Sequence, residues 1–182
     1  MRRAVFVVLA CIASTAGASA QNTWKGLHFG ESRDDVRNQL AAQSITVETA
    51  QDGTLQATKN YELTIPGLRY PFPMLASFHF DDASDLADVT LALDLPAMRL
   101  YWAAIGPEDA LANFAAEKLT GALSGRYGTP LYRSTACDAE TKQPAFCIVS
   151  WPGSGQTIEL ERGTSPKGLR LLVRYQPLAN DL

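Results

Sequence analysis

The chain has 182 residues, of which 46% are hydrophobic and 19% are charged, and its formal net charge is −3. The 16 Lys and Arg residues are scattered along the sequence, so the dense basic patch that contacts nucleic acid or anionic lipid is missing. We therefore expect no nucleic-acid partner.

The first twenty residues have the pattern of an export signal. Two arginines precede an apolar run over residues 4–13, and residues 18–20 have the small-x-small spacing that signal peptidase accepts. The pattern predicts cleavage between Ala20 and Gln21, which leaves a single domain over residues 21–182 in the periplasm or outside the cell. Because a bilayer span takes about 20 apolar residues, we expect no transmembrane segment in the mature chain.

The three cysteines bear on the same question of compartment. Cys11 follows Val8-Leu9-Ala10, and this spacing offers the alternative of acylation at Cys11 and a lipid-anchored chain. Cys137 and Cys147 remain after cleavage at either place. An even pair of cysteines in an exported chain predicts a disulfide, which would close a polar loop and stabilise the fold by about 2.5–3 kcal/mol.

The mature sequence begins with elements that read as a strand and a helix. Residues 24–30 predict a short strand, and Ser32 has the position of a helix N-cap with an acidic residue, Asp35, three positions later. Val36 and Leu40 then form an apolar stripe. We expect the first helix to begin directly after Ser32.

A hairpin and a second helix follow in the middle of the chain. Residues 76–80 and 88–95 alternate between apolar and polar side chains, which predicts two antiparallel strands joined by the acidic turn 81–85. Residues 107–127 repeat apolar side chains at helical spacing. Two glycines in this helix, Gly121 and Gly125, predict the close approach of a neighbouring element.

The last third of the chain predicts three more strands, over residues 146–151, 157–161 and 169–175. The outward positions of the last two strands are of opposite charge. If the turn at residues 163–168 pairs them, carboxylates face guanidinium groups across the ladder. The residues concerned are Glu159, Glu161, Arg170 and Arg174.

Together these elements predict an α+β fold. Two helices would pack on one face of a largely antiparallel sheet. The order of a helix and about four strands, repeated once, indicates an internal duplication of architecture without a visible repeat of residues.

The opening of the mature chain carries a resemblance to known proteins. Its pattern is Trp24-x-Gly26-Leu27-x-Phe29-Gly30-x-Ser32-x-x-x-Val36-x-x-x-Leu40, and a helix that ends in Tyr127-Gly128-x-Pro130 comes later. This resembles many small exported bacterial proteins of unknown role. It is also loosely similar to the β-lactamase-inhibitor-protein-like group and to small outer-membrane assembly lipoproteins. The resemblance implies a helix-plus-sheet repeat and the binding of other proteins.

Two segments combine aromatic residues with arginine, as protein-binding surfaces often do. They are the proline-rich segment 66–73 and the segment 96–102. The alternative is that their large apolar side chains, such as Leu100, fold inward and close the ends of the core. The candidate interaction surface consists of Arg69, Tyr70, Phe72, Arg99, Tyr101 and Trp102.

The sequence holds no pattern typical of a catalytic site, a metal site or a cofactor site. His28 and His79 are the only histidines, and neither belongs to a metal-binding or catalytic motif. We therefore expect an exported domain that binds a protein or a cell-envelope component, with no cofactor and no metal. The alternatives are a small periplasmic hydrolase or envelope-modifying enzyme, and an inhibitor of an extracytoplasmic enzyme.

Overall fold

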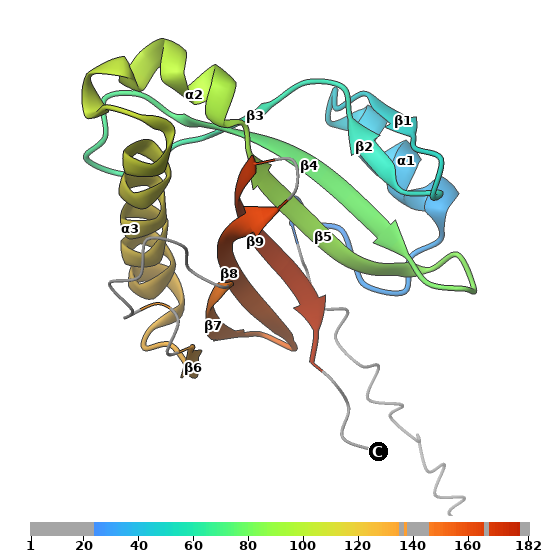
Figure 1. The fold of residues 1–182 in the computed structure, drawn as a ribbon. Coiled ribbons are helices and arrows are strands. Elements are labelled where there is room, and N and C mark those ends of the chain that lie inside the picture. The colour runs from blue at the N-terminus through green and yellow to red at the C-terminus, as the bar shows by residue number, and fades with distance from the viewer. Residues whose placement is uncertain (1–23, 135–136, 138–145, 166–167, 179–182) are drawn as a thin grey trace, which may run out of the picture.

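A single antiparallel sheet of nine strands organises the described part of the chain, which in this computed structural model comprises residues 24–134, 137, 146–165 and 168–178 (Figure 1). The predicted export signal, the Ala20–Gln21 cleavage site and Cys11 lie outside these residues. The sheet order is β1-β2-β4-β5-β9-β8-β7-β6, and β3 pairs with β4 beside β2.

The bounds of the elements are as follows. The helices are α1 (Arg33–Ala42), α2 (Leu95–Trp102), the 3-10 helix η1 (Ala103–Ile105) and α3 (Glu108–Tyr127). The strands are β1 (Val47–Thr49), β2 (Leu55–Ala57), β3 (Tyr61–Leu63), β4 (Phe72–Phe80), β5 (Leu86–Leu93), β6 (Tyr132–Arg133), β7 (Cys147–Gly153), β8 (Gln156–Ser165) and β9 (Gly168–Pro177).

The core lies on one face of this sheet, because the strand register aligns apolar residues in rows. One row crosses six strands and consists of buried side chains only: Leu55, Phe78, Val89, Tyr175, Ile158 and Trp151. Helix α3 packs against β7, β8 and β9, whereas α1 lies beside β1 at the other end (Figure 1). The α+β fold with a largely antiparallel sheet is therefore confirmed.

The opposite face of the sheet is mostly polar, as the alternation predicted. Glu159 is in register with Arg174, and the Arg174 guanidinium lies 3.0 Å from the Glu161 carboxylate. Arg170 is instead opposite Gly163. The expected charge pairing is thus confirmed for Arg174 and wrong for Arg170, whose position in the ladder faces no acidic residue.

Residues at the helix ends explain where α1 begins and where α3 stops. The Ser32 hydroxyl accepts a hydrogen bond from the Asp35 amide at 3.3 Å and donates to the Asp35 carboxylate at 2.6 Å. This reciprocal arrangement satisfies an otherwise unpaired amide in the first turn. The second predicted helix is α3, and Gly128 ends it with a positive φ of 86°.

Two sequence predictions about backbone are wrong. Residues 24–30 form turns rather than a strand, because Lys25, Gly26 and Gly30 all take positive φ values that an extended chain does not allow. Gly121 and Gly125 face open space, and a Cβ atom at either position would meet nothing within 4 Å. No neighbouring element approaches them among the described residues.

A third helix, α2, was not predicted. It occupies residues 95–102, whereas we expected the strand to reach residue 95 and the segment 96–102 to lead into the next helix. Asp94 caps it by accepting a hydrogen bond from the Ala97 amide at 2.9 Å, and Pro96 lies in the first turn, where its missing N–H costs nothing. The described part of the chain therefore has three α-helices, one more than the two that the sequence predicts.

The chain divides into two halves of similar layout. In the first half α1 precedes β1, β2, β4 and β5, with the short β3 inserted; in the second half α3 precedes β6 to β9. Consecutive strands pair in each half, and the final strands β5 and β9 pair with each other at the centre of the sheet. This layout agrees with the expected helix-plus-four-strand duplication.

Candidate interaction surface

The two aromatic segments singled out in the sequence come together at one end of the molecule. The Tyr70 ring lies 5.7 Å from the Tyr101 ring and 5.6 Å from the Trp102 ring, measured between centroids. Arg69 places its guanidinium 5.1 Å from the centroid of the Tyr70 ring. Segments some 30 residues apart in sequence thus form a continuous aromatic group.

The inner part of this group belongs to the core. Phe72 is fully buried, and its ring contacts those of Trp102 and Phe114 at centroid distances of 6.1 and 6.2 Å. Trp102 is half-buried and lies 5.0 Å from Phe114. The prediction that Phe72 belongs to an exposed surface is therefore wrong, because its position in β4 points it between the sheet and the helices.

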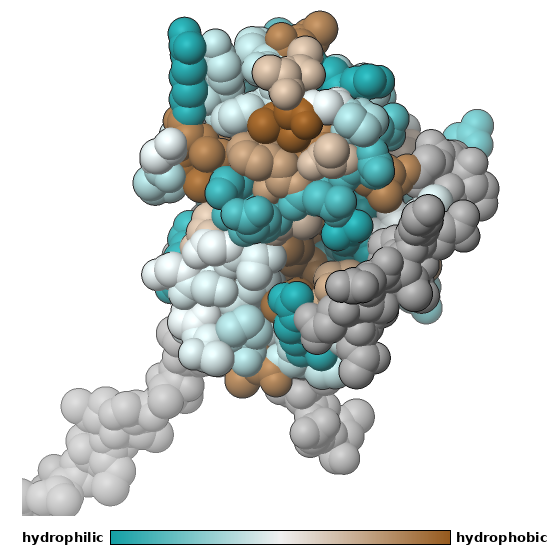
Figure 2. Space-filling view, turned by 60° about the vertical axis from the view of Figure 1, so that its left-hand side comes forward, coloured by the Kyte–Doolittle hydropathy of each residue, from teal (hydrophilic) through white to brown (hydrophobic). Residues whose placement is uncertain are grey.

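The outer part of the group is exposed to solvent. Leu100 is 80% exposed, Tyr101 51% and Ile105 37%, and the side chains of Arg69 and Arg99 beside them are exposed as well. We call these five residues the α2 surface. Figure 2 shows the apolar side chains of this side of the molecule gathered in its upper part, over α2 and η1.

Helical spacing explains why these side chains point outward. Leu95, Met98 and Trp102 recur at intervals of three and four residues and pack inward, so the positions between them face solvent. The alternative that Leu100 folds inward is wrong for this reason. This helical spacing can be read from the sequence. The proline at the second helical position favoured a loop instead, and for that reason no helix was predicted here.

The α2 surface has the chemistry of a binding surface. Aromatic and aliphatic groups lie beside guanidinium groups, and residues of these types dominate the binding energy of many protein interfaces. The Tyr101 ring contacts Tyr70, which in turn contacts Trp102, so the exposed Tyr101 ring loses little conformational freedom when a partner docks.

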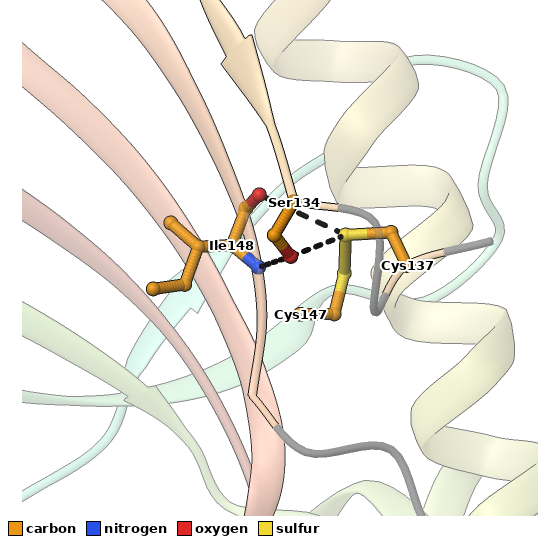
Figure 3. Close-up of a disulfide and its surroundings, with 4 residues drawn as sticks. All are labelled: Ser134, Cys137, Cys147 and Ile148. Atoms are coloured by element: carbon orange, nitrogen blue, oxygen red, sulfur yellow. Dashed lines mark hydrogen bonds between the residues drawn. A yellow bond between two sulfur atoms is a disulfide. The ribbon is translucent and has the colours of Figure 1, made fainter. Parts of the chain in front are cut away.

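The predicted disulfide between Cys137 and Cys147 is confirmed (Figure 3). It lies beside the middle of α3, where both cysteines line a pocket together with Ala116 and Thr120. The Ser134 hydroxyl accepts a hydrogen bond from the Ile148 amide at 3.0 Å and lies 3.5 Å from the Cys137 sulfur. Because a disulfide sulfur carries no proton, the hydroxyl is the donor in the second contact. The bond therefore fixes the start of β7 to the end of β6.

The two histidines do not form a catalytic arrangement. His28 lies in the turn before α1, whereas His79 lies on β4 and points to the polar face of the sheet. The His79 ring contacts the Thr54 hydroxyl at 3.3 Å, and its other nitrogen is 3.9 Å from the Asp88 carboxylate, too far for a hydrogen bond. This geometry does not orient the ring as a general base requires.

Groups of metal ligands and membrane-spanning helices are also missing from the described residues. They contain no group of three or more His, Cys, Asp or Glu side chains placed to hold a metal ion. Among the same residues, none of the helices combines the length and the apolar character that a membrane crossing requires.

Comparison with known proteins adds no family to these observations. No protein family, no curated protein and no solved structure matches this chain.

Proposed function

We propose that this protein is an exported, non-catalytic binding domain that docks a protein partner on the α2 surface. The observation that carries the proposal is the 80% exposure of Leu100 on α2. Trp102, on the same helix, packs against Tyr70 and Phe114. A large apolar side chain exposed to water gains free energy when a partner covers it.

Several features support the extracytoplasmic location in this proposal. The first twenty residues have the pattern of an export signal, and a disulfide persists in oxidising compartments but is rare in the cytosol. The repeated helix-plus-strand layout agrees with the resemblance to the β-lactamase-inhibitor-protein-like group, whose members mostly bind proteins. Inhibition of an extracytoplasmic enzyme is a special form of the proposed binding.

The charges beside the apolar residues describe the partner. Arg69 and Arg99 are exposed, so we expect the partner to present an apolar surface bordered by Asp or Glu side chains. Attraction between such charges mainly increases the rate of association, and added salt weakens it.

Site-specific photo-crosslinking in the living cell tests the proposal. A photoreactive amino acid at position 100 is expected to form a crosslink to a defined partner, and the same group at position 131 is the control. Leu131 is 69% exposed but lies beside β6, at the opposite end of α3. Equal crosslinking from both positions, or none from position 100, would contradict the proposal.

Direct binding to the identified partner completes the test. Leu100→Asp places a charge where we expect an apolar contact, and it should weaken binding at least 10-fold, whereas Leu131→Asp should change it less than 2-fold. Neither residue is buried, so both variants should keep the unfolding midpoint of the parent.

A further inference from the structure

A pocket of about 240 Å³ lies in the first half of the molecule. It is bordered by the end of α1, by the turn at residues 24–26, which we call the Trp24 turn, and by the strands β2 and β3. We call it the Trp24 pocket. It shares no residue with the α2 surface. Its lining consists of Trp24, Ser44, Ile45, Thr46, Ala57, Lys59, Asn60, Tyr61 and Ala76.

Aromatic rings form one wall of this pocket, and small side chains leave its interior free. Trp24 and Tyr61 meet edge to face, with centroids 5.4 Å apart and an interplanar angle of 87°. Ala57 and Ala76 are buried beneath them and fill little space. Since an apolar cavity of about 150 Å³ holds a benzene molecule, this pocket holds a six-membered ring with a short substituent.

Two lysines and one carboxylate lie at the pocket. The Asp94 carboxylate accepts a hydrogen bond from the Asn60 side chain of the lining at 2.8 Å and another from the Ala97 amide at 2.9 Å. Lys59 is part of the lining, and the Lys25 ammonium lies 4.5 Å from the centroid of Tyr61 and 5.9 Å from that of Trp24. The described lining contains no Asp or Glu. In a chain with a net negative charge, this entrance therefore favours an anion over a cation.

The rim of the pocket is fixed by strained and hydrogen-bonded backbone. Lys25 and Ser44 have φ values of 59° and 62°, in the left-handed region that residues other than glycine rarely enter. The side-chain amide of Gln43 donates a hydrogen bond to the Lys25 carbonyl at 3.0 Å and so holds the Trp24 turn against the end of α1. The pocket is thus formed before any ligand arrives.

We propose that the Trp24 pocket binds a small aryl monocarboxylate, with its ring beside Trp24 and Tyr61 and its carboxylate near Lys59 and Lys25. Ring burial supplies the affinity, and the two ammonium groups supply the preference for a negative charge. Because both lysines are exposed, we expect a modest preference that falls as salt is added.

Binding of a matched series of probes tests this site. Phenylacetate, phenylacetamide and 2-phenylethylamine share a ring but differ in charge, and acetate lacks the ring. Titration of the purified protein, expressed from the full-length sequence, is followed by the indole N–H signals of its three tryptophans, which single Trp→Phe variants assign. We expect phenylacetate to shift the Trp24 signal in a saturable manner, at least 5-fold more tightly than phenylacetamide.

Variants separate the contributions of ring and charge. Lys59→Gln should weaken phenylacetate binding about 3-fold and leave phenylacetamide unchanged, whereas Lys118→Gln on α3 is the control and should affect neither. Thr46→Phe at the exposed rim should fill the pocket and abolish binding without unfolding the protein. The proposal is overturned if no aryl probe shifts Trp24, if 2-phenylethylamine or acetate binds as well as phenylacetate, or if Lys59→Gln weakens both ligands equally.

Discussion

The half of the molecule that ends at β5 and the half that ends at β9 have the same order of helix and strands. They differ in the lengths of these elements. In the first half α1 has 10 residues and β1 to β3 have three residues each. In the second half α3 has 20 residues and β7 to β9 have 7 to 10. The short helix covers less of the sheet, and a pocket remains beside Trp24. In the second half a long helix covers the strands and a disulfide ties down the start of β7. The pocket of about 270 Å³ beside α3 is lined by this disulfide and by charged side chains such as Glu117 and Arg162, with no aromatic ring among the described residues.

The difference shows how one arrangement of elements can serve two purposes. A half whose helix covers its strands provides stability, because it buries more apolar area. A half whose helix is short leaves space at the end of the helix, and space with aromatic walls can accept a ligand. Four substitutions or conditions test this division, beginning with the largest expected effect.

Removal of the central tryptophan of each half should have unequal consequences. Trp151 is fully buried and its indole N–H donates to the Ser124 hydroxyl at 3.2 Å, whereas Trp24 borders a pocket. We expect Trp151→Ala to lower the free energy of unfolding by about 4–5 kcal/mol and Trp24→Ala by about 3 kcal/mol. Urea denaturation measures both, with Trp→Phe at each position as the milder variant if Trp151→Ala does not fold. An equal loss at the two positions would remove the distinction between the halves.

Loss of the disulfide should weaken the second half in particular. The double variant Cys137→Ala/Cys147→Ala opens a loop with a sequence separation of 10 residues, which is expected to cost about 2.5–3 kcal/mol. Hydrogen exchange followed by mass spectrometry should show faster exchange in β6 and β7. Unchanged exchange there, or equal acceleration in β2 and β3, would contradict this assignment.

Alkaline pH should destabilise the junction between the halves. Tyr175 on β9 faces β5, and burial raises the pKa of its phenol well above the ordinary value of 10. The folded protein therefore keeps the phenol protonated while the unfolded chain ionises above pH 10, so stability is complete below that pH and falls as the pH rises further. The loss approaches about 1.4 kcal/mol per pH unit for one proton. Chemical denaturation at pH 8 and pH 11 should show it, and Tyr175→Phe should remove this contribution.

Two substitutions should stabilise the halves, one by introducing a glycine and the other by removing one. Ser44→Gly relieves a positive φ at the end of α1 and is expected to add about 1 kcal/mol. Gly121→Ala restores an ordinary helical residue in open space on α3 and is expected to add about 0.5–1 kcal/mol. Thermal unfolding measures both. A loss of stability in Ser44→Gly would mean that the Ser44 side chain contributes more than its backbone costs.

Long periodic segments were predicted well from the sequence. The β4–β5 hairpin, α3 and the strands β7 to β9 each span enough residues for their period to be visible, and Ser32 marked the start of α1 through its cap. The strands β1 to β3 have three residues each, too few for an alternation to be recognised. β2 and β3 form because β4 offers them an edge, and β1 forms because it pairs with β2; no local pattern records either tertiary cause.

The candidate surface was predicted only in part. Arg69, Tyr70, Arg99, Tyr101 and Trp102 do gather at one end of the molecule, because α2 lies beside the segment that precedes β4. The exposure of Leu100 and the burial of Phe72 depend on which way α2 and β4 turn their side chains. The Trp24 pocket was not predicted, because it exists only where four separate segments meet.

The pairing of β5 with β9 also sets the order in which the molecule can fold. β9 is the last strand of the sheet in sequence but lies at its centre. Val89 on β5 can therefore pair only after Tyr175, which lies 86 positions later, has been made. Contacts between such distant residues slow folding, because a long loop must close before they form. Until the ribosome has made β9, the hairpin β4–β5 and the strands β7–β8 each have an unpaired edge. The central pair of strands therefore closes the sheet only after β9 has been made, and every earlier intermediate exposes strand edges that can pair wrongly.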